Sequence, residues 1–136
     1  MWRILCVDDD KDSCEIAELT LRFISSDYEV TTAQSSLDAL ALIAEQRFDL
    51  YILDYWMPQI DGLEICRRVR QTDVKVPIVI LSADAYESSR PRALKAGANE
   101  YLTKPNGLLQ LSEVIPRLLL LAAAGSEKAS RDNVEI

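Results

Sequence analysis

The stretch Phe48-Asp-Leu-Tyr-Ile-Leu-Asp54 decides the fold class of this 136-residue chain. Before Asp54 it is nearly continuously apolar, which is typical of a strand buried on both faces. A second run, from Pro77 to Leu81, is wholly apolar. Strands of this kind occur in parallel sheets that helices cover on both sides. The two runs therefore predict an α/β fold.

Three further strands and five helices alternate with these two runs. The segment 28–32 is more polar than the other strands, so we place it at a sheet edge. The alternation predicts a doubly wound, five-stranded parallel sheet of order 2-1-3-4-5 with five helices. The expected strands cover residues 3–7, 28–32, 48–53, 77–81 and 100–103, and the expected helices cover residues 13–23, 36–46, 62–70, 90–96 and 108–121.

Apolar spacing suggests the buried faces of the helices. Residues at helical spacing in the first helix are Ile16, Leu19 and Phe23. Residues expected to face inward in the second and third helices are Leu40, Ile43, Ala44, Leu63, Cys66 and Val69. The basic residues Arg67, Arg68 and Arg70 are expected to form a solvated face that ends near the C-terminal dipole of the third helix.

The end of the chain is predicted to leave the domain. We expect a domain over residues 1–121 and a short flexible tail over 122–136, because the sequence after Leu121 is small and polar. Pro116 should kink or interrupt the last helix. Pro91 favours a helix start near Arg90, which leaves residues 84–89 as a loop.

Composition excludes several classes of protein. Its 49% apolar and 27% charged residues are typical of a globular domain, and no uninterrupted apolar run has the length of a membrane span. The absence of histidine excludes Ser-His-Asp and Cys-His catalysis and any phosphohistidine within this chain. Three cysteines without CxxC spacing fit packing residues in a reducing cytoplasm. A net charge of −7 disfavours nucleic-acid binding.

Acidic and other polar residues stand at the carboxyl ends of four predicted strands: Asp8-Asp9-Asp10, Asp54, Ser82 and Lys104. In doubly wound sheets, ligands bind just outside these ends. Neighbouring first and third strands would bring Asp8, Asp9 and Asp54 into one pocket. Mg²⁺ would relieve their repulsion, Lys104 would balance the charge from the other side, and an aspartate can act as a nucleophile toward phosphorus.

The chain resembles the receiver domain of two-component response regulators, of the stand-alone single-domain type, over about residues 3–121. The resemblance rests on five motifs in order: Val7-Asp-Asp-Asp10, Leu53-Asp-Tyr-Trp-Met-Pro-Gln-Ile-Asp-Gly62, Leu81-Ser-Ala83, Ala93-Leu-Lys-Ala-Gly-Ala98 and Tyr101-Leu-Thr-Lys-Pro105. It implies a flavodoxin-like receiver fold.

The resemblance also implies a role for each matching residue. Asp54 would be the phosphoacceptor and a metal ligand, and Lys104 would pair with the phosphoryl oxygens. Ser82 would donate its hydroxyl to the phosphoryl group, and Tyr101 would be the aromatic switch that follows Ser82. The remaining ligands of Mg²⁺ would be Asp8, Asp9 and the main-chain carbonyl of Trp56. Asp10, Asp12 and the Asp61-Gly62 turn are interpreted as structural.

Trp56 departs from the family pattern, because that position often carries a smaller or polar side chain. We expect its bulk to restrict access to Asp54 and to change the lifetime of an aspartyl phosphate. It also keeps open a second hypothesis, a phosphorylation-independent interaction module. An aspartate-nucleophile phosphatase would need an acid at position 56, and a flavodoxin-like flavin protein would not place three acids after the first strand.

The expected partners follow from the resemblance. A histidine kinase or a histidine phosphotransfer protein would donate the phosphoryl group, and a downstream protein would be the target. We expect no catalysis beyond the chain's own phosphorylation and dephosphorylation, no direct contact with nucleic acid or membrane, and a possible homodimer through the fourth helix, fifth strand and fifth helix.

Overall fold

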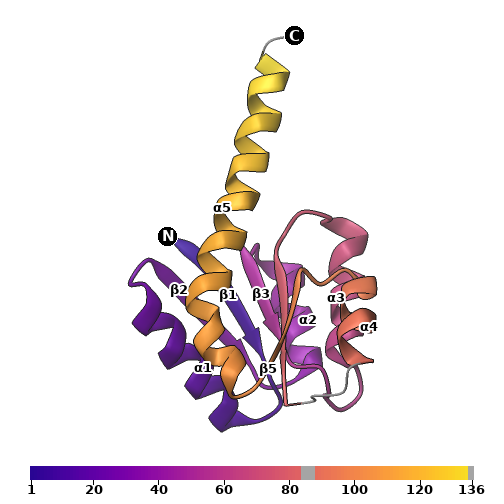
Figure 1. Cartoon of the computed structure of the whole chain (residues 1–136). Helices are drawn as coiled ribbons and strands as arrows, with labels where there is room; N and C mark the ends of the chain where they lie inside the picture. The colour runs from indigo at the N-terminus through magenta and orange to yellow at the C-terminus, as the bar shows by residue number, and fades with distance from the viewer. Residues whose placement is uncertain (84–87, 135–136) are drawn as a thin grey trace.

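A computed structural model describes residues 1–83 and 88–134 of the chain, with the backbone alone for 125–134 (Figure 1). Five parallel strands form one sheet of order β2-β1-β3-β4-β5, which confirms the predicted topology. The strands are β1 (Trp2–Val7), β2 (Tyr28–Ala33), β3 (Leu50–Leu53), β4 (Ile78–Ser82) and β5 (Glu100–Thr103). The helices are α1 (Lys11–Ile24), α2 (Ser36–Glu45), α3 (Gly62–Thr72), α4 (Ser89–Ala96) and α5 (Asn106–Val134).

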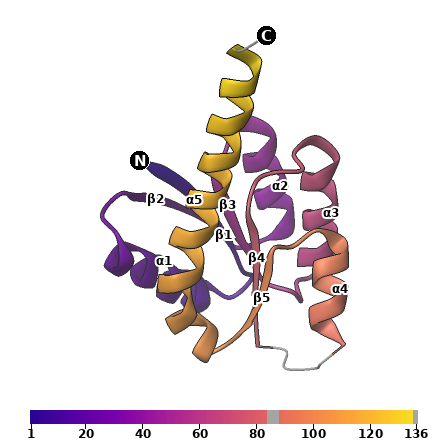
Figure 2. The same cartoon turned by 45° about the horizontal axis from the view of Figure 1, so that its top comes forward.

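Helices cover both faces of the sheet (Figures 1 and 2). Successive side chains of β1 point to opposite faces, so Ile4 and Cys6 join the core under α1 and α5, whereas Leu5 and Val7 join the core under α2, α3 and α4. All four residues of β3 and all five of β4 are buried, as their apolar runs predicted. Both strands are thereby enclosed between the two helix layers, with their carboxyl ends at one edge of the sheet.

The buried face of α1 is formed by Cys14, Ala17 and Leu21. The other apolar set at helical spacing, Ile16, Leu19 and Phe23, lies on the opposite side, where Ile16 is 51% and Phe23 is 93% exposed. Both sets repeat at i, i+3 and i+7, and they are offset by two residues, or about 200° around a helix. Spacing alone could not distinguish them.

The faces of α2 and α3 differ from the prediction at single positions. In α2, Ala39 is buried and Ile43 packs against the core, but Ala44 is exposed, so its predicted inward orientation was wrong. In α3, Leu63, Cys66 and Val69 are buried as expected, and Ile65 is buried as well.

Arg70 was wrongly assigned to a solvated face. Its Nε donates to the carbonyl oxygen of Gly97 at 2.9 Å, and its Nη1 donates to the carbonyls of Asp73 at 3.1 Å and Val76 at 2.6 Å. Its Nη2 donates to Oδ1 of Asn99 at 3.0 Å. We call this set of hydrogen bonds the Arg70 clamp; it joins the end of α3 to the turn between α4 and β5.

The last helix is longer than predicted. It includes Pro116 without ending there and continues past Leu121 to Val134, so the helix end expected at Leu121 was wrong. Leu118 and Leu119 are buried in the core beyond Pro116, and this packing supports the helix after the proline. Its C-terminal half extends beyond the sheet (Figure 1). The domain boundary at 121 and the flexibility of the tail stay predictions, and residues 135–136 lie outside the described part.

The described residues include one helical segment, 106–124, that is long and apolar enough to cross a membrane by length and composition, with a mean hydropathy of 1.5. The core helix of a globular protein passes the same test. Leu111, Val114 and Ile115 of this segment are buried against the sheet, whereas Leu109, Leu120 and Leu121 are exposed, so packing accounts for part of its apolar character.

Candidate functional site

The site lies at the carboxyl ends of the central strands. Val7 of β1 is paired with Leu53 of β3, so Asp8 and Asp54 leave the sheet side by side. The N–H of Asp54 donates to the carbonyl oxygen of Val7 at 2.9 Å, which holds the two strand ends together. One carboxylate oxygen from each of Asp8, Asp9 and Asp54 lies within 4.8 Å of the others. The predicted acidic cluster is therefore assembled by the β1-β3 pairing.

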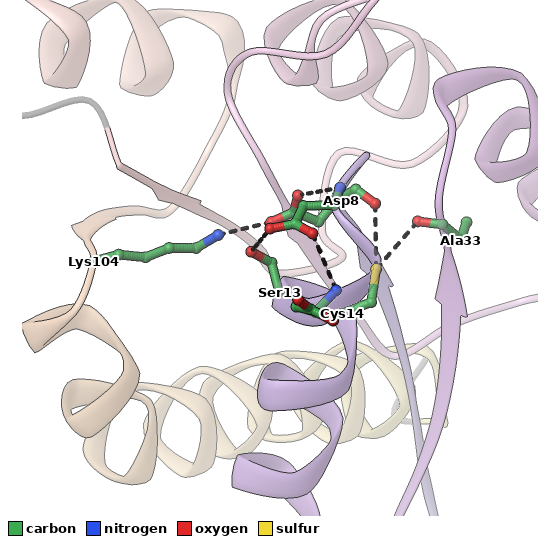
Figure 3. Close-up of polar contacts among 7 residues, drawn as sticks. Asp8, Ser13, Cys14, Ala33 and Lys104 are labelled. Carbon is green, nitrogen blue, oxygen red and sulfur yellow. Dashed lines mark hydrogen bonds and ion pairs between the residues drawn. The ribbon is translucent and has the colours of Figure 1, made fainter.

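Asp8 is the most buried member of the cluster and is held from several directions (Figure 3). Its Oδ2 lies 2.7 Å from Nζ of Lys104, and its Oδ1 accepts the N–H of Asp10 at 3.0 Å. Its own N–H donates to the carbonyl oxygen of Ala33 at 3.1 Å. Lys104 thus meets the cluster from the end of β5, 96 residues away in sequence.

The electrostatics of the cluster make Asp54 an unusual aspartate. Burial and, second, the neighbouring Asp8 carboxylate raise the pKa of Asp54 to about 7, although Lys104 opposes this shift. Partial burial and the negative charge of the neighbouring carboxylates both disfavour the ionised form of Asp54. A cation placed among the three carboxylates would reverse that effect.

Ser82 and Tyr101 lie where the sequence predicted, on β4 and β5. Ser82 ends β4, is 1% exposed, and its carbonyl oxygen accepts the N–H of Lys104 at 2.8 Å. Tyr101 is buried in the core beneath α3 and α4, with its ring centroid 6.3 Å from that of Tyr55. Ser82 and Lys104 are thereby joined at the site edge, while the Tyr101 ring occupies an inward position.

The loop after β3 carries Trp56 at the surface. Its side chain is 58% exposed, and its ring lies 4.6 Å, between centroids, from the buried ring of Tyr55. The Trp56 side chain lines the space between α3 and α4 with Leu63 and Arg92, and its expected effect on access to Asp54 stays a prediction.

Gly62 and Cys14 are supporting residues whose role could not be inferred from the sequence. A Cβ on Gly62 would lie 2.0 Å from the main-chain oxygen of Asp54, so only glycine permits this approach of α3 to the end of β3.

The thiol of Cys14 donates to the carbonyl oxygen of Asp8 at 3.2 Å (Figure 3). Burial raises the pKa of all three cysteine thiols, so they fit the predicted packing role.

Two aspartates have the structural roles predicted for them. The side chain of Asp10 caps α1 by accepting the N–H of Asp12, and that of Asp61 caps α3 by accepting the N–H of Glu64. Such caps satisfy helix N–H groups that have no partner within the helix.

Comparison with known proteins agrees with this arrangement. The model of the response regulator receiver domain family matches residues 4–116. Among curated proteins, response regulator MprA of Mycobacterium sp. (strain KMS) is 40% identical over 131 residues, which cover 96% of this chain and 55% of the relative. MprA of Mycobacterium leprae is 42% identical over 86% of this chain and 50% of the relative. The chain thus spans about half the length of these relatives.

Several solved structures match over nearly their whole length. A putative response regulator from Chloroflexus aurantiacus is 37% identical with a TM-score of 0.80, covering 88% of this chain and 98% of that one. A CheY-like receiver domain protein from Methanospirillum hungatei is 27% identical with a TM-score of 0.83, covering 92% and 98%. The BeF3-activated DrrB receiver domain is 30% identical with a TM-score of 0.79, covering 88% and 97%. The chain therefore belongs to the response regulator receiver domain family of two-component signalling.

Proposed function

We propose that this chain is a phosphoacceptor whose Asp54 takes a phosphoryl group from a phosphohistidine of another protein. One observation carries the proposal: the Asp54 carboxylate stands at the end of β3 with oxygens of Asp8 and Asp9 within 4.8 Å, and the Asp8 carboxylate is paired with Lys104. The donor histidine lies outside these 136 residues, because they contain no histidine. A histidine kinase or a histidine phosphotransfer protein fits that requirement.

In the transfer, an Asp54 carboxylate oxygen forms a bond to phosphorus. The bond between phosphorus and the donor's imidazole nitrogen breaks, and that nitrogen keeps the electron pair. Lys104 balances the charge on the phosphoryl oxygens, and the Ser82 hydroxyl donates a hydrogen bond to one of them. Hydrolysis of the resulting acyl phosphate returns the Asp54 carboxylate, so the chain's covalent chemistry is confined to its own phosphorylation and dephosphorylation.

The donor set suits Mg²⁺, a hard cation that prefers carboxylate, carbonyl and water oxygens. Asp8, Asp9, Asp54 and the main-chain carbonyl of Trp56 would hold it. The bound ion supplies positive charge that neutralises the carboxylates and the incoming phosphoryl oxygens. It would also favour the ionised Asp54, which the raised pKa of this side chain otherwise disfavours at neutral pH.

Output follows from a shift between two conformations. With the phosphoryl group in place, Ser82 would move toward it, and the Tyr101 ring, which is already buried in this structure, would be held inward behind Ser82. This would stabilise one of the two arrangements of the face formed by α4, β5 and α5. A change from 1:99 to 99:1 between the two states requires about 5.5 kcal/mol of differential stabilisation. The altered face would bind a downstream protein or a second copy of the chain in the cytoplasm, without direct contact to nucleic acid or membrane.

The test is the intact mass of the chain after incubation with acetyl phosphate and Mg²⁺. The wild type should gain the mass of one phosphoryl group, and EDTA should abolish this gain. Asp54→Asn should gain nothing. Asp27→Asn removes an exposed carboxylate before β2 by the same atom change, and it should be labelled like the wild type.

A further variant, Trp56→Asn, distinguishes restricted access to Asp54 from loss of the phosphoacceptor function. If the wild type is not labelled but Trp56→Asn is, the indole excludes small donors and the phosphoacceptor proposal stands. If neither is labelled, and a histidine kinase with broad specificity labels neither, the proposal is wrong and the chain is a phosphorylation-independent interaction module.

A further inference from the structure

A groove of about 520 Å³ lies between α3 and α4, beside the loop that follows β3. The two helices lie side by side on the same face of the sheet (Figures 1 and 2). Residues that line the groove include Tyr55, Trp56, Leu63, Arg67, Arg92 and Lys95. We propose that this groove, called here the α3-α4 groove, binds an acidic segment of a partner protein in which carboxylates flank an apolar side chain.

The charge of the α3-α4 groove is opposite to that of the chain. Three basic side chains line it against one carboxylate, that of Asp61, whereas the chain carries a net charge of −7. Asp61 is already engaged, since its Oδ1 accepts the N–H of Glu64 at 2.8 Å. A basic site on an acidic protein attracts acidic ligands locally, while the rest of the surface repels them. The charge of the groove therefore favours the binding of acidic ligands.

Two of the three cations are available to a ligand. Arg92 and Lys95 are exposed and one helical turn apart on α4, so they share a face. Within residues 1–83 and 88–124, no carboxylate oxygen lies within 4.0 Å of their side-chain nitrogens. Arg67, in contrast, shares Glu64 with Arg68 at 3.4 Å. The pair on α4 is the main charge that a ligand would meet.

The groove also offers an apolar contact. The ring of Trp56 is 58% exposed at one side, and Leu63 contributes to the lining. Trp, Tyr and Arg are the residues that contribute most often to the centres of protein interfaces. A bare anion such as phosphate would use the cations and leave the exposed indole in water. A peptide with an apolar side chain between carboxylates uses both, which is why we commit to a protein segment.

The experiment is an NMR titration of the ¹⁵N-labelled full chain with the acetylated peptide Glu-Glu-Leu-Glu-Glu-Leu. Amide signals of α3 and α4 and the indole N–H of Trp56 should shift, and higher salt should weaken binding. Arg92→Glu with Lys95→Glu should raise the Kd by about tenfold or more, which is about 1.4 kcal/mol. The matched control, Arg22→Glu with Lys75→Glu, makes the same charge change away from the groove and should alter the Kd by less than about twofold.

Two control peptides test the stated chemistry. Replacing Leu by Ser, or Glu by Gln, should each abolish most of the shift. Equal affinity of the groove and control variants, shifts confined to other helices, or shifts produced by inorganic pyrophosphate but not by the peptide would overturn the proposal. Phosphoryl labelling of Asp54 should be unchanged in the Arg92→Glu, Lys95→Glu variant, so a failure of the groove proposal is distinguishable from a failure of the phosphoacceptor proposal.

Discussion

Asp54 is the central residue of the proposed site, and its ionisation destabilises the folded state. Its pKa is raised from 3.8 to about 7, so between these values the unfolded chain releases this proton while the folded chain keeps it. The folded state then binds more protons, and the free energy of unfolding falls as pH rises through this range. Without metal, ionisation of Asp54 should therefore lower the free energy of unfolding at pH 8.

Asp54→Asn removes that loss because asparagine does not ionise. In EDTA, we expect the variant to match the wild type near pH 4 and to exceed its free energy of unfolding by about 1–2 kcal/mol near pH 8. Urea denaturation at several pH values measures this difference. Glu113→Gln, which neutralises an exposed carboxylate on α5, should show no such divergence. A constant difference between Asp54→Asn and wild type at every pH would contradict the explanation.

Trp56 should control the lifetime of the aspartyl phosphate. Its exposed indole stands two residues beyond Asp54, and we expect its bulk to restrict the approach of the water that hydrolyses the acyl phosphate. We expect Trp56→Asn to hydrolyse its phosphate about fivefold faster, which corresponds to about 1 kcal/mol of the barrier. The decay of the phosphorylated mass with time measures the rate. Equal rates in the two proteins would show that the indole does not limit access.

At the scale of elements, the Arg70 clamp is a polar link between the end of α3 and the turn that joins α4 to β5. Three backbone carbonyls and the Asn99 side chain accept from one guanidinium, and Oδ1 of Asn99 also accepts the N–H of Ile78 at 2.8 Å. Burial lowers the pKa of Arg70, but its hydrogen bonds keep the charged form in place. The clamp orients α4 relative to α3, and so shapes the groove between them.

Arg70→Met keeps most of the aliphatic stem but leaves these acceptors without their donor. We expect the free energy of unfolding to fall by about 2–3 kcal/mol, as for a lost group of hydrogen bonds to a charged donor. Urea denaturation should show the change, and hydrogen exchange should quicken at Ala98. Arg68→Met is the control on the same helix, because Arg68 is 46% exposed and pairs only with Glu64 among the described residues. It should cost less than about 0.5 kcal/mol.

At the scale of the whole molecule, the core extends past the end of the family match. That match stops at residue 116, yet Leu118 and Leu119 are buried with Ile4 and Leu21 in the core under α1 and α5. A chain ending at residue 124 keeps all of these contacts. A chain ending at residue 116 loses both leucines and exposes part of the face that they cover.

We therefore expect the chain of residues 1–124 to unfold at the same urea concentration as the full chain. The chain of residues 1–116 should lose about 3–6 kcal/mol, since burial of each leucine side chain contributes about 1.5–3 kcal/mol. Circular dichroism during urea titration compares the three chains. If residues 1–116 proved as stable as residues 1–124, the packing of Leu118 and Leu119 would contribute little.

The sequence by itself determined the sheet and most of the candidate site. The apolar runs before Asp54 and Ser82 indicate strands buried on both faces of a parallel sheet, and they place both residues at strand ends. Since the carboxyl ends of parallel strands meet at one edge, the acidic cluster and Lys104 could be predicted to converge without any distance. The caps at Asp10 and Asp61 were likewise local, because a cap depends on three or four consecutive residues.

The tertiary structure alone decided which face of α1 is buried, what Arg70 contacts, and why position 62 is glycine. Periodicity specifies the spacing of apolar residues on a helix but not the rotation of that helix against the sheet. The sequence therefore could not distinguish the face of Cys14 from the face of Ile16 as the buried one. The Arg70 clamp and the approach of Gly62 to Asp54 join segments whose separation is set only when the helices dock. Such contacts depend on three-dimensional positions, and no local pattern in the chain encodes them.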